Sequence, residues 1–276
     1  MLSLSQKFRP VLSTPFGRVG YRELAPCDAL KPYVCCFWTE KYAAAREILV
    51  IPDTCMDIIF RLGKGAGSFF CTLDERSFYS RSVGEELFGI RFYAWTAGLF
   101  SRRDFSRNGG KALCVEEFFD GASELSSSIA HAQTFEERAA AAEKWLLKRL
   151  ENIRANNDLL NAVDLLLETD GRAKIADICL HTAISPRGLE RLFKREMGVS
   201  PKTFSGLVRY QLLWREMALR GGFDILDGVE KFGYFDQAHL LNDFKKRHLM
   251  NPKEALYYAN KYAKNSNSVA FLQDFR

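Results

Sequence analysis

Residues 185–204 read SPRGLERLFKREMGVSPKTF, and a related block, DQAHLLNDFKKRHLMNPKEA, follows 51 positions later at residues 236–255. Apolar and basic residues recur at the same places in both blocks. The matched pairs are Leu189 with Leu240, Phe193 with Phe244, Lys194 with Lys245, Pro201 with Pro252, Lys202 with Lys253 and, upstream, Ile178 with Val229. Such an internal repeat indicates two copies of one supersecondary unit.

The first copy has the signals of a helix-turn-helix. Ser185 is a favoured N-cap and Pro186 suits the first helical position. A shorter helix over 175–180 and a tight turn over 181–184 precede this helix. Its predicted buried face comprises Leu189, Leu192 and Phe193, and its exposed face Arg187, Glu190, Arg191, Lys194 and Arg195. A second helix with an exposed basic face can enter a major groove about 12 Å wide.

The second copy repeats this arrangement. A helix is predicted over 225–231, and Gly233 can end it in the left-handed conformation. Asp236 can cap the following helix, and Asn251 can cap a final one. The second helix is predicted to bury Leu240 and Phe244 and to expose Gln237, His239, Asn242, Lys245 and Lys246. A helix over 202–219 joins the two copies and spans about 27 Å, which could set the reading helices about one DNA turn apart.

Charge gathers on the same elements. Residues 187–209 carry six basic and two acidic residues, and residues 231–253 carry five and two. Solvated faces of an ordinary helical bundle would explain either cluster alone, but poorly explain why both occupy the same place in a repeat. Clustering on the proposed reading helices favours DNA binding.

The overall composition sets wider limits. The chain has 276 residues, 47% of them hydrophobic, so it can bury the cores of one large or two ordinary domains. Its 39 basic and 34 acidic residues give a net charge of +5, which permits nucleic-acid binding without arguing for it. No apolar run approaches the roughly 20 residues that cross a bilayer, and residues 1–10 lack a signal-peptide pattern. A cytoplasmic protein without membrane contact is expected.

The N-terminal half has a different pattern. Short apolar, β-branched or aromatic runs with Gly-rich turns predict strands at Tyr33–Trp38, Ile48–Ile51, Asp57–Leu62, Ser68–Leu73 and Leu87–Tyr93. The pattern turns helical from about residue 122, where Thr134 and Glu137 form a capping-box signature. The predicted fold is α+β with two domains: a β-rich barrel or sandwich with trailing helices over 1–151, and an all-α double helix-turn-helix over 157–262. The helix-turn-helix units are placed at about 174–196 and 225–247.

The cysteines give little sign of a metal site. The seven are Cys27, Cys35, Cys36, Cys55, Cys71, Cys114 and Cys179. None form a C-x-x-C pair, and the four histidines, from His131 on, are far along the chain from most of them. We therefore interpret the cysteines as reduced core thiols and predict no metal ligand and no cofactor.

Residues 157–260 resemble the DNA-binding domain of AraC/XylS-type transcription regulators. The shared motifs are SPRGLERLFK at 185–194, GVSP at 198–201 and GYxDxAHxxxxFKK at 233–246. In that family, two helix-turn-helix units on one chain read adjacent major grooves. The resemblance places base contacts on Arg187, Glu190, Arg191, Gln237, Ala238, His239 and Asn242, and we add Ser185, Lys194 and Lys245 to the predicted DNA-binding set.

The second unit departs from the family pattern at three positions. Asn242 stands where an arginine is usual, so it can pair with an adenine edge but cannot make arginine's bidentate contact with guanine. Leu240 replaces a phenylalanine, and Leu249 replaces a glycine at the helix end. The resemblance therefore implies altered or weaker reading by this unit.

Residues 20–150 resemble, more faintly, the sensor domain of some of these regulators. The matching pieces are LxPYVxxxW at 30–38, VxPDxCxDIIF at 50–60, GIRF at 89–92, and EER at 136–138 before WLL at 145–147. The resemblance implies a cupin-like fold. The aromatic-rich strands predict one of two arrangements. One is a plain aromatic core, and the other is an apolar pocket whose few polar groups come from Trp38, Arg91 and Trp95. Arg91 would either grip an anionic effector or form a structural ion pair.

These observations predict a sequence-specific DNA-binding transcription regulator whose N-terminal domain senses a small molecule or mediates dimerisation. Its expected partners are double-stranded DNA, a small-molecule effector, RNA polymerase and a second copy of the chain. No catalytic residue is predicted, because no histidine precedes His131 and none therefore lies near a cysteine such as Cys55 in the sequence. The alternatives are a cysteine-based redox sensor or modifying enzyme with a DNA-binding tail, and a nonspecific basic binder of nucleic acid.

Overall fold

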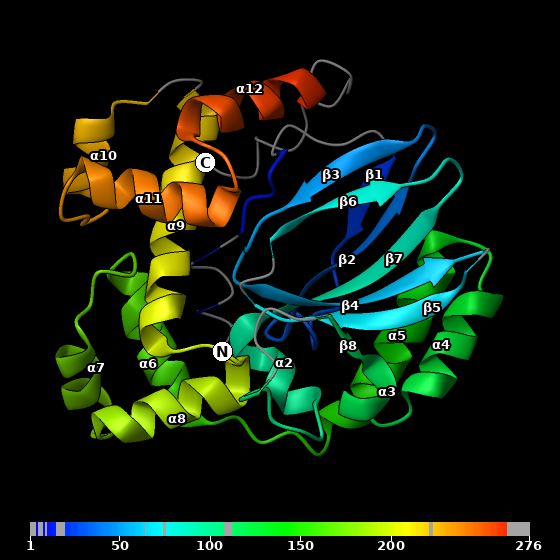
Figure 1. Ribbon diagram of the computed structural model, residues 1–276. Coiled ribbons are helices and arrows are strands. Elements are labelled where there is room, and N and C mark those ends of the chain that lie inside the picture. Colours follow the sequence, from blue (N-terminus) through cyan, green and yellow to red (C-terminus); the bar gives the residue numbers. More distant parts are fainter. Residues whose placement is uncertain are drawn as a thin grey trace.

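The structure is a computed structural model, and it describes residues 4, 8, 10–14, 20–63, 65–73, 76–107, 112–220 and 223–263. Most of residues 1–10, where no signal peptide was predicted, lie outside the described residues. A β-rich N-terminal part and a helical C-terminal part lie side by side (Figure 1).

Two antiparallel sheets form the N-terminal part. The larger has the strand order β1-β2-β7-β4-β5-β8, and the smaller pairs β3 with β6. The strands are β1 (Tyr21–Leu24), β2 (Val34–Lys41), β3 (Arg46–Val50), β4 (Cys55–Leu62), β5 (Gly67–Cys71), β6 (Ser77–Arg81), β7 (Glu86–Tyr93) and β8 (Ala112–Cys114). The five predicted strands are all present, and the β-rich fold class is confirmed.

Strand β7 occupies the middle of the larger sheet and is buried on both faces. Gly89 faces Trp38 of β2 across the ladder. A Cβ atom at Gly89 would lie 2.1 Å from the Trp38 ring, so only glycine lets the indole lie flat over β7. This close approach fixes the direction in which the Trp38 ring nitrogen points.

The helices of the N-terminal part cover the larger sheet, as Figure 1 shows for α4 and α5. Thr134 and Glu137 form the predicted capping box at the start of α5. Helix α2 follows β7 directly and was not predicted. These helices are α2 (Ala94–Phe100), α3 (Val115–Phe118), α4 (Ala122–His131) and α5 (Phe135–Leu150).

The C-terminal part is entirely helical in its described residues. Its helices are α6 (Asn157–Glu168), α7 (Ile175–Thr182), α8 (Pro186–Met197), α9 (Pro201–Arg220), α10 (Ile225–Lys231), α11 (Gln237–His248) and α12 (Pro252–Ala263). Both helix-turn-helix pairs, α7 with α8 and α10 with α11, have the predicted helix order. Helix α9 runs between them, and α8 and α11 lie near its opposite ends (Figure 1).

A continuous apolar core connects the two parts. Trp95 in α2 packs against the edge of Phe204 in α9, with their ring centroids 6.3 Å apart. The backbone N–H of Phe105 donates to the carbonyl of Arg195 in α8 over 2.9 Å. The two parts therefore share buried surface.

Candidate functional site

Helix α8 begins as its sequence predicted. The Ser185 hydroxyl accepts a hydrogen bond from the Gly188 N–H over 3.2 Å, and Pro186 is the first helical residue. Gly198 ends the helix in the left-handed conformation, with φ of 72°. These ends fix the register, so Leu189 and Phe193 point into the core. The opposite face is left to solvent.

The exposed face of α8 carries two unpaired arginines. Arg187 and Arg191 are both exposed, and neither has a hydrogen-bond or ion-pair partner among the described residues. Glu190 instead pairs with Lys194, at 3.0 Å between carboxylate and ammonium. The guanidinium groups are therefore available for an external partner. Two arginines on one helix face are suited to guanine edges or phosphates.

Helix α11 repeats the arrangement with more neutral groups. The Asp236 carboxylate accepts a hydrogen bond from the His239 N–H over 2.7 Å. The predicted outer residues of this helix are all exposed: Gln237, Ala238, His239, Asn242 and Lys245. This face therefore offers amide and imidazole groups with one lysine, where α8 offers two arginines.

A buried histidine fastens α11 to α9. His248 is fully buried, its Nδ1 lies 2.7 Å from the Tyr210 hydroxyl, and its ring stacks on Phe244. Burial lowers the pKa of His248 from 6.5 to about 3, so the ring is neutral at physiological pH. Leu249 follows with φ of 59°, a left-handed conformation that a leucine rarely adopts. The helix thus ends in the glycine-type geometry without the glycine.

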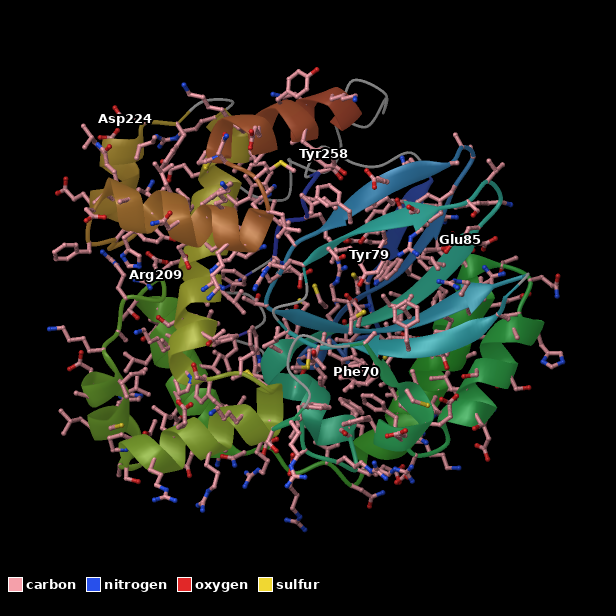
Figure 2. All side chains as sticks on the ribbon, viewed as in Figure 1. Phe70, Tyr79, Glu85, Arg209, Asp224 and Tyr258 are labelled. Atoms are coloured by element: carbon pink, nitrogen blue, oxygen red, sulfur yellow. The ribbon has the colours of Figure 1, made fainter. Side chains whose placement is uncertain are left out.

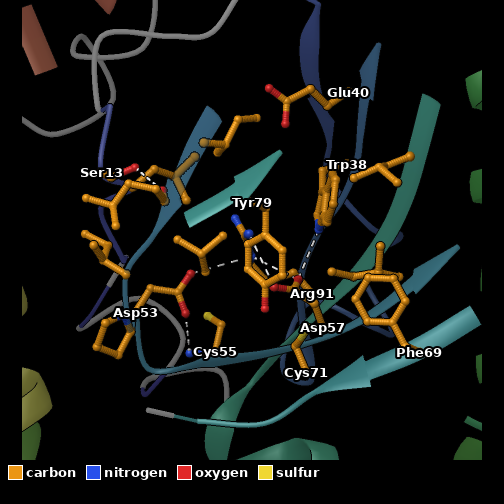
Figure 3. A pocket seen from close by; sticks show the side chains of 18 of the residues that line it. Ser13, Trp38, Glu40, Asp53, Cys55, Asp57, Phe69, Cys71, Tyr79 and Arg91 are labelled. Carbon is orange, nitrogen blue, oxygen red and sulfur yellow. Dashed lines mark hydrogen bonds and ion pairs between the residues drawn. The ribbon is translucent and has the colours of Figure 1, made fainter. Parts of the chain in front are cut away.

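A cavity lies between the two sheets of the N-terminal part (Figure 3). The volume of this cavity is about 100 Å³. A single water needs only about 10–15 Å³, so the aromatic-rich strands enclose a void and are not packed solid. Most lining side chains are apolar and come from β2–β7, among them Ile48, Ile59, Phe69 and Leu87.

Trp38 and Arg91 line this cavity, as predicted, but Trp95 does not. Trp95 is 2% exposed and stacks on Tyr93 beneath the helical part. The prediction placed it in the pocket because the strand-rich region is unusually rich in aromatic residues. The chain turns into α2 at residue 94 instead, and this turn directs the indole toward the interface between the two parts.

Arg91 forms a buried ion pair. Its Nε atom donates to Asp57 Oδ1 over 3.1 Å, and its Nη2 atom donates to Asp57 Oδ2 over 3.4 Å. Two more carboxylates lie nearby, Glu23 at 3.7 Å and Asp53 at 3.9 Å. Of the two alternatives for this arginine, the geometry favours the structural ion pair over a free anion-binding group.

Asp53 lies at the cavity wall on a strained loop. The adjacent Thr54 has φ of 66°, which is uncommon for a β-branched residue, and its hydroxyl donates to the Asp53 carbonyl. The Cys55 N–H donates to Asp53 Oδ1 over 3.0 Å. Burial raises the pKa of Asp53 to about 6, and Arg91 only partly opposes the shift. Backbone strain of this kind is characteristic of functional sites.

The environments of three of the seven cysteines argue against a reactive thiol at those positions. Burial and contact with Cys35 raise the pKa values of Cys36 and Cys55 well above the ordinary thiol value. The exposed Cys114 is hydrogen-bonded to Glu116, which also raises its pKa. A reactive cysteine needs a lowered pKa. The described residues contain no cluster of three His, Cys, Asp or Glu side chains placed to hold a metal ion.

Hydrogen bonds join the cavity wall to helix α9. The Gln211 side chain donates to the Pro52 carbonyl over 2.9 Å and accepts from the Val11 N–H over 2.6 Å. The Trp214 indole donates to the Leu12 carbonyl over 2.9 Å. Pro52 and Leu12 both line the cavity. Sequence reasoning missed this contact, since a glutamine inside an apolar helix carries no sign of its partner.

A second contact comes from the last helix. The Tyr258 hydroxyl of α12 accepts a hydrogen bond from the Leu49 N–H of β3 over 3.1 Å (Figure 2). Strand β3 forms one wall of the cavity, with Leu49 among its lining residues. Both α9 and α12 of the helical part therefore touch the walls of the N-terminal cavity.

Comparison with known proteins bears on both parts. Residues 178–256 match a family model described as a helix-turn-helix domain, and residues 22–111 match one described as a domain of unknown function, DUF6597. No curated protein sequence matches the chain. In the described part of the chain, no helix has the length and apolar character needed to cross a membrane.

Three of the solved structures with some likeness to this chain are the following. A probable AraC family transcriptional regulator from Rhodopseudomonas palustris is 23% identical, with a TM-score of 0.35, over 38% of this chain and 98% of that one. Apo ToxT from Vibrio cholerae is 13% identical, with a TM-score of 0.42, over 80% and 97%. ToxT with a bound unsaturated fatty acid is 12% identical, with a TM-score of 0.38, over 80% and 93%.

The two matched helix-turn-helix pairs on α9 define the C-terminal part as an AraC-type helix-turn-helix DNA-binding domain. It follows a β-rich part, within which residues 22–111 match the domain of unknown function.

Proposed function

We propose that this protein binds specific DNA sequences with α8 and α11 in two successive major grooves, and that a small molecule in the N-terminal cavity changes that binding. The observation that carries the first part is geometric. Two capped helices with exposed polar faces lie near opposite ends of one 20-residue helix, α9. Such a helix is about 30 Å long, close to the roughly 34 Å of one DNA turn.

The two helices contribute unequally. Arg187 and Arg191 on α8 have no intramolecular ion-pair partner in the described chain, so binding DNA breaks no existing bond. Arginine makes the commonest specific contact with guanine. Gln237, His239 and Asn242 on α11 make fewer charged contacts, and Lys245 beside them is suited to phosphate. The first unit therefore supplies most of the base selectivity.

The cavity supports the sensing role. Its wall residues Leu12 and Pro52 are hydrogen-bonded to α9, the helix that sets the distance between α8 and α11. A molecule that displaced either wall segment would act directly on that helix. Because interfaces of packed helices have discrete arrangements, a small shift at the wall can change the relative placement of the two reading helices.

Selection of bound duplexes from a random-sequence library tests the proposal. We expect an enriched site with two half-sites about 10–11 base pairs apart. Arg191→Ala should relax the choice of base at one position of the site, while Lys148→Ala, a matched loss of an exposed charge on α5, should leave the enriched sequence unchanged. The proposal is refuted if no sequence is enriched, or if competitor DNA removes all complexes equally.

A further inference from the structure

Two arginines line the polar side of the cavity: Arg81 pairs with Glu85 at 3.3 Å, and Arg91 lies among three carboxylates. Arg91 is 6% exposed, and three carboxylates, from Asp57, Glu23 and Asp53, lie within 4 Å of it. Its Nε and Nη2 atoms are occupied by Asp57, and its Nη1 atom by the Tyr21 hydroxyl at 3.3 Å. One positive charge thus meets three negative ones. An anionic ligand would meet these three carboxylates and a guanidinium group in which each nitrogen already donates one hydrogen bond.

Asp53 is the least compensated of the acids that line the cavity. Asp57 accepts hydrogen bonds from both Arg91 and the Trp38 indole, and Glu40 pairs with Arg46 at 2.9 Å. Among the residues that the structure describes, the nearest cation to Asp53 is Arg91, 3.9 Å away and beyond hydrogen-bond distance. In Figure 3 the Asp53 carboxylate points into the cavity from the strained loop. A desolvated carboxylate with a distant counter-ion is suited to a cationic partner.

The remaining lining complements an organic cation. Trp38, Tyr42 and Tyr79 line the same cavity. Each ring already has a guanidinium group at its face, that of Arg91 at 5.9 Å from Trp38, Arg46 at 5.0 Å from Tyr42 and Arg81 at 5.1 Å from Tyr79. Aromatic faces attract positive charge, and these rings already meet guanidinium groups of the chain, so the attraction for a further cation comes mainly from the Asp53 carboxylate. The aliphatic residues Ile48, Ile51 and Leu87 offer an apolar surface for the body of the ligand. The cavity therefore combines a carboxylate, aromatic rings and an apolar wall.

We propose that the cavity binds a small organic cation, an amine on an apolar body, with Asp53 as the counter-ion of its ammonium group. This inference rests on the proposed sensing role of the N-terminal domain and names the chemical class of its ligand. Asp53 follows Pro52, whose carbonyl accepts the hydrogen bond from Gln211 of α9. An ammonium group drawn to Asp53 therefore acts one residue from the contact between the cavity wall and the DNA-binding domain.

Matched ligands of equal chain length test the charge preference. Butyl, hexyl and octyl ammonium ions are titrated calorimetrically into the full-length protein and compared with the corresponding alcohols and carboxylates. We expect at least one ammonium ion to bind about tenfold or more tightly than its alcohol, since hydrogen bonds to charged groups are the stronger ones. The carboxylate should bind weakest. Tightest binding of a carboxylate, equal binding of ammonium and alcohol, or no binding across the series would each overturn the proposal.

Variants assign the preference to Asp53. Asp53→Asn keeps an oxygen for the Cys55 N–H and should remove the preference for ammonium over alcohol, while Asp28→Asn should keep it. Asp28 is an exposed surface acid paired with Lys31, so it is a matched control. Circular dichroism and thermal melting establish that both variants fold. Retention of the ammonium preference by Asp53→Asn would overturn the assignment.

The pH dependence of the wild-type protein gives a readout that needs no substitution. With the pKa of Asp53 near 6, ammonium binding should be about tenfold weaker at pH 5 than at pH 7.5. The titratable and charged groups that face Asp53 are Arg91, Asp57, Cys55, Cys35 and, on α9, Tyr210. An affinity that does not change with pH would contradict the role of Asp53.

DNA binding measured on the same samples separates this inference from the proposed function. If the protein enriches a specific DNA site but shows no ammonium preference, only the ligand class is wrong. If it shows the preference but enriches no DNA site, the ligand class stands and the proposed function falls.

Discussion

Acidification from pH 7 to pH 5 should weaken the attachment of α11 to α9 through a single side chain, His248. Its pKa is about 3 in the folded protein, against an ordinary value of 6.5, because burial disfavours the charged ring. A lowered folded pKa means that the unfolded chain takes up the proton first. The contribution of the neutral ring to stability is therefore complete above about pH 6.5 and is lost as the pH falls toward 3. At pH 5 the loss amounts to about 2 kcal/mol.

Asp53 acts in the opposite direction. Its folded pKa of about 6 lies above the ordinary 3.8, so the folded state favours the neutral carboxyl. The stabilisation that comes from the neutral carboxyl is complete below about pH 4 and is lost as the pH rises through 6. Between pH 5 and pH 7 the free energy of unfolding falls by about 1 kcal/mol for this reason. Between pH 7 and pH 5 the free energy of unfolding of the wild-type protein should therefore change by only about half of the amount that His248 alone would cause.

Urea unfolding of the wild type and His248→Gln at both pH values isolates the histidine. The difference in unfolding free energy between the two proteins should shrink by about 2 kcal/mol on going from pH 7 to pH 5. The variant His131→Gln, which alters an exposed histidine, should show no such change. If the difference for His248→Gln stays constant with pH, the ring is not held neutral by burial and the reasoning fails.

Four other outcomes are expected. Arg191→Ala should cost about 1–3 kcal/mol on the selected DNA site and Asn242→Ala less, as measured by titration on cognate and scrambled duplexes; the reverse order would show that α11 is the main reader. Lys245→Ala should lower the slope of log affinity against log salt by about one unit, equally for all sequences. Leu249→Gly should raise the unfolding free energy by about 1 kcal/mol, because it relieves the left-handed strain at a half-exposed position; an unchanged melting temperature would contradict this. Gln211→Leu should lower it by about 2–3 kcal/mol, because the Pro52 carbonyl and the Val11 N–H lose their buried partner; urea unfolding measures the change.

The parts of the fold that depend on local signals could be predicted from the sequence. Ser185, Asp236 and Thr134 are caps that act within three residues, so the helices after them begin as predicted. The exposed residues of α8 and α11 follow from helical periodicity once those starts are fixed. The turn at Leu249 could not be predicted in this way, because a leucine at a position where the resembling family has glycine left its geometry in doubt; the backbone keeps the left-handed conformation.

The parts that depend on distant contacts could not be predicted. Strand β6 alternates between half-buried and exposed residues and includes no run of apolar side chains, so only its pairing with β3 identifies it. The ion pair between Arg91 and Asp57 depends on the register of β4 against β7. Trp95 was misplaced because its surroundings come from α9, more than 100 residues along the chain.

The continuous core has a consequence for the exchange of parts between regulators. Trp95 and Phe204, and Gln211 with Pro52, meet across what the domain order alone would treat as a simple joint. A hybrid that grafts residues 157–263 onto a foreign sensor would expose these apolar surfaces and leave Gln211 without its acceptor. A stable hybrid would therefore have to retain the N-terminal segment, the loop at Pro52 and α2 together with the DNA-binding domain. The unit that evolution or a designer can move is a larger block than the helix-turn-helix pair.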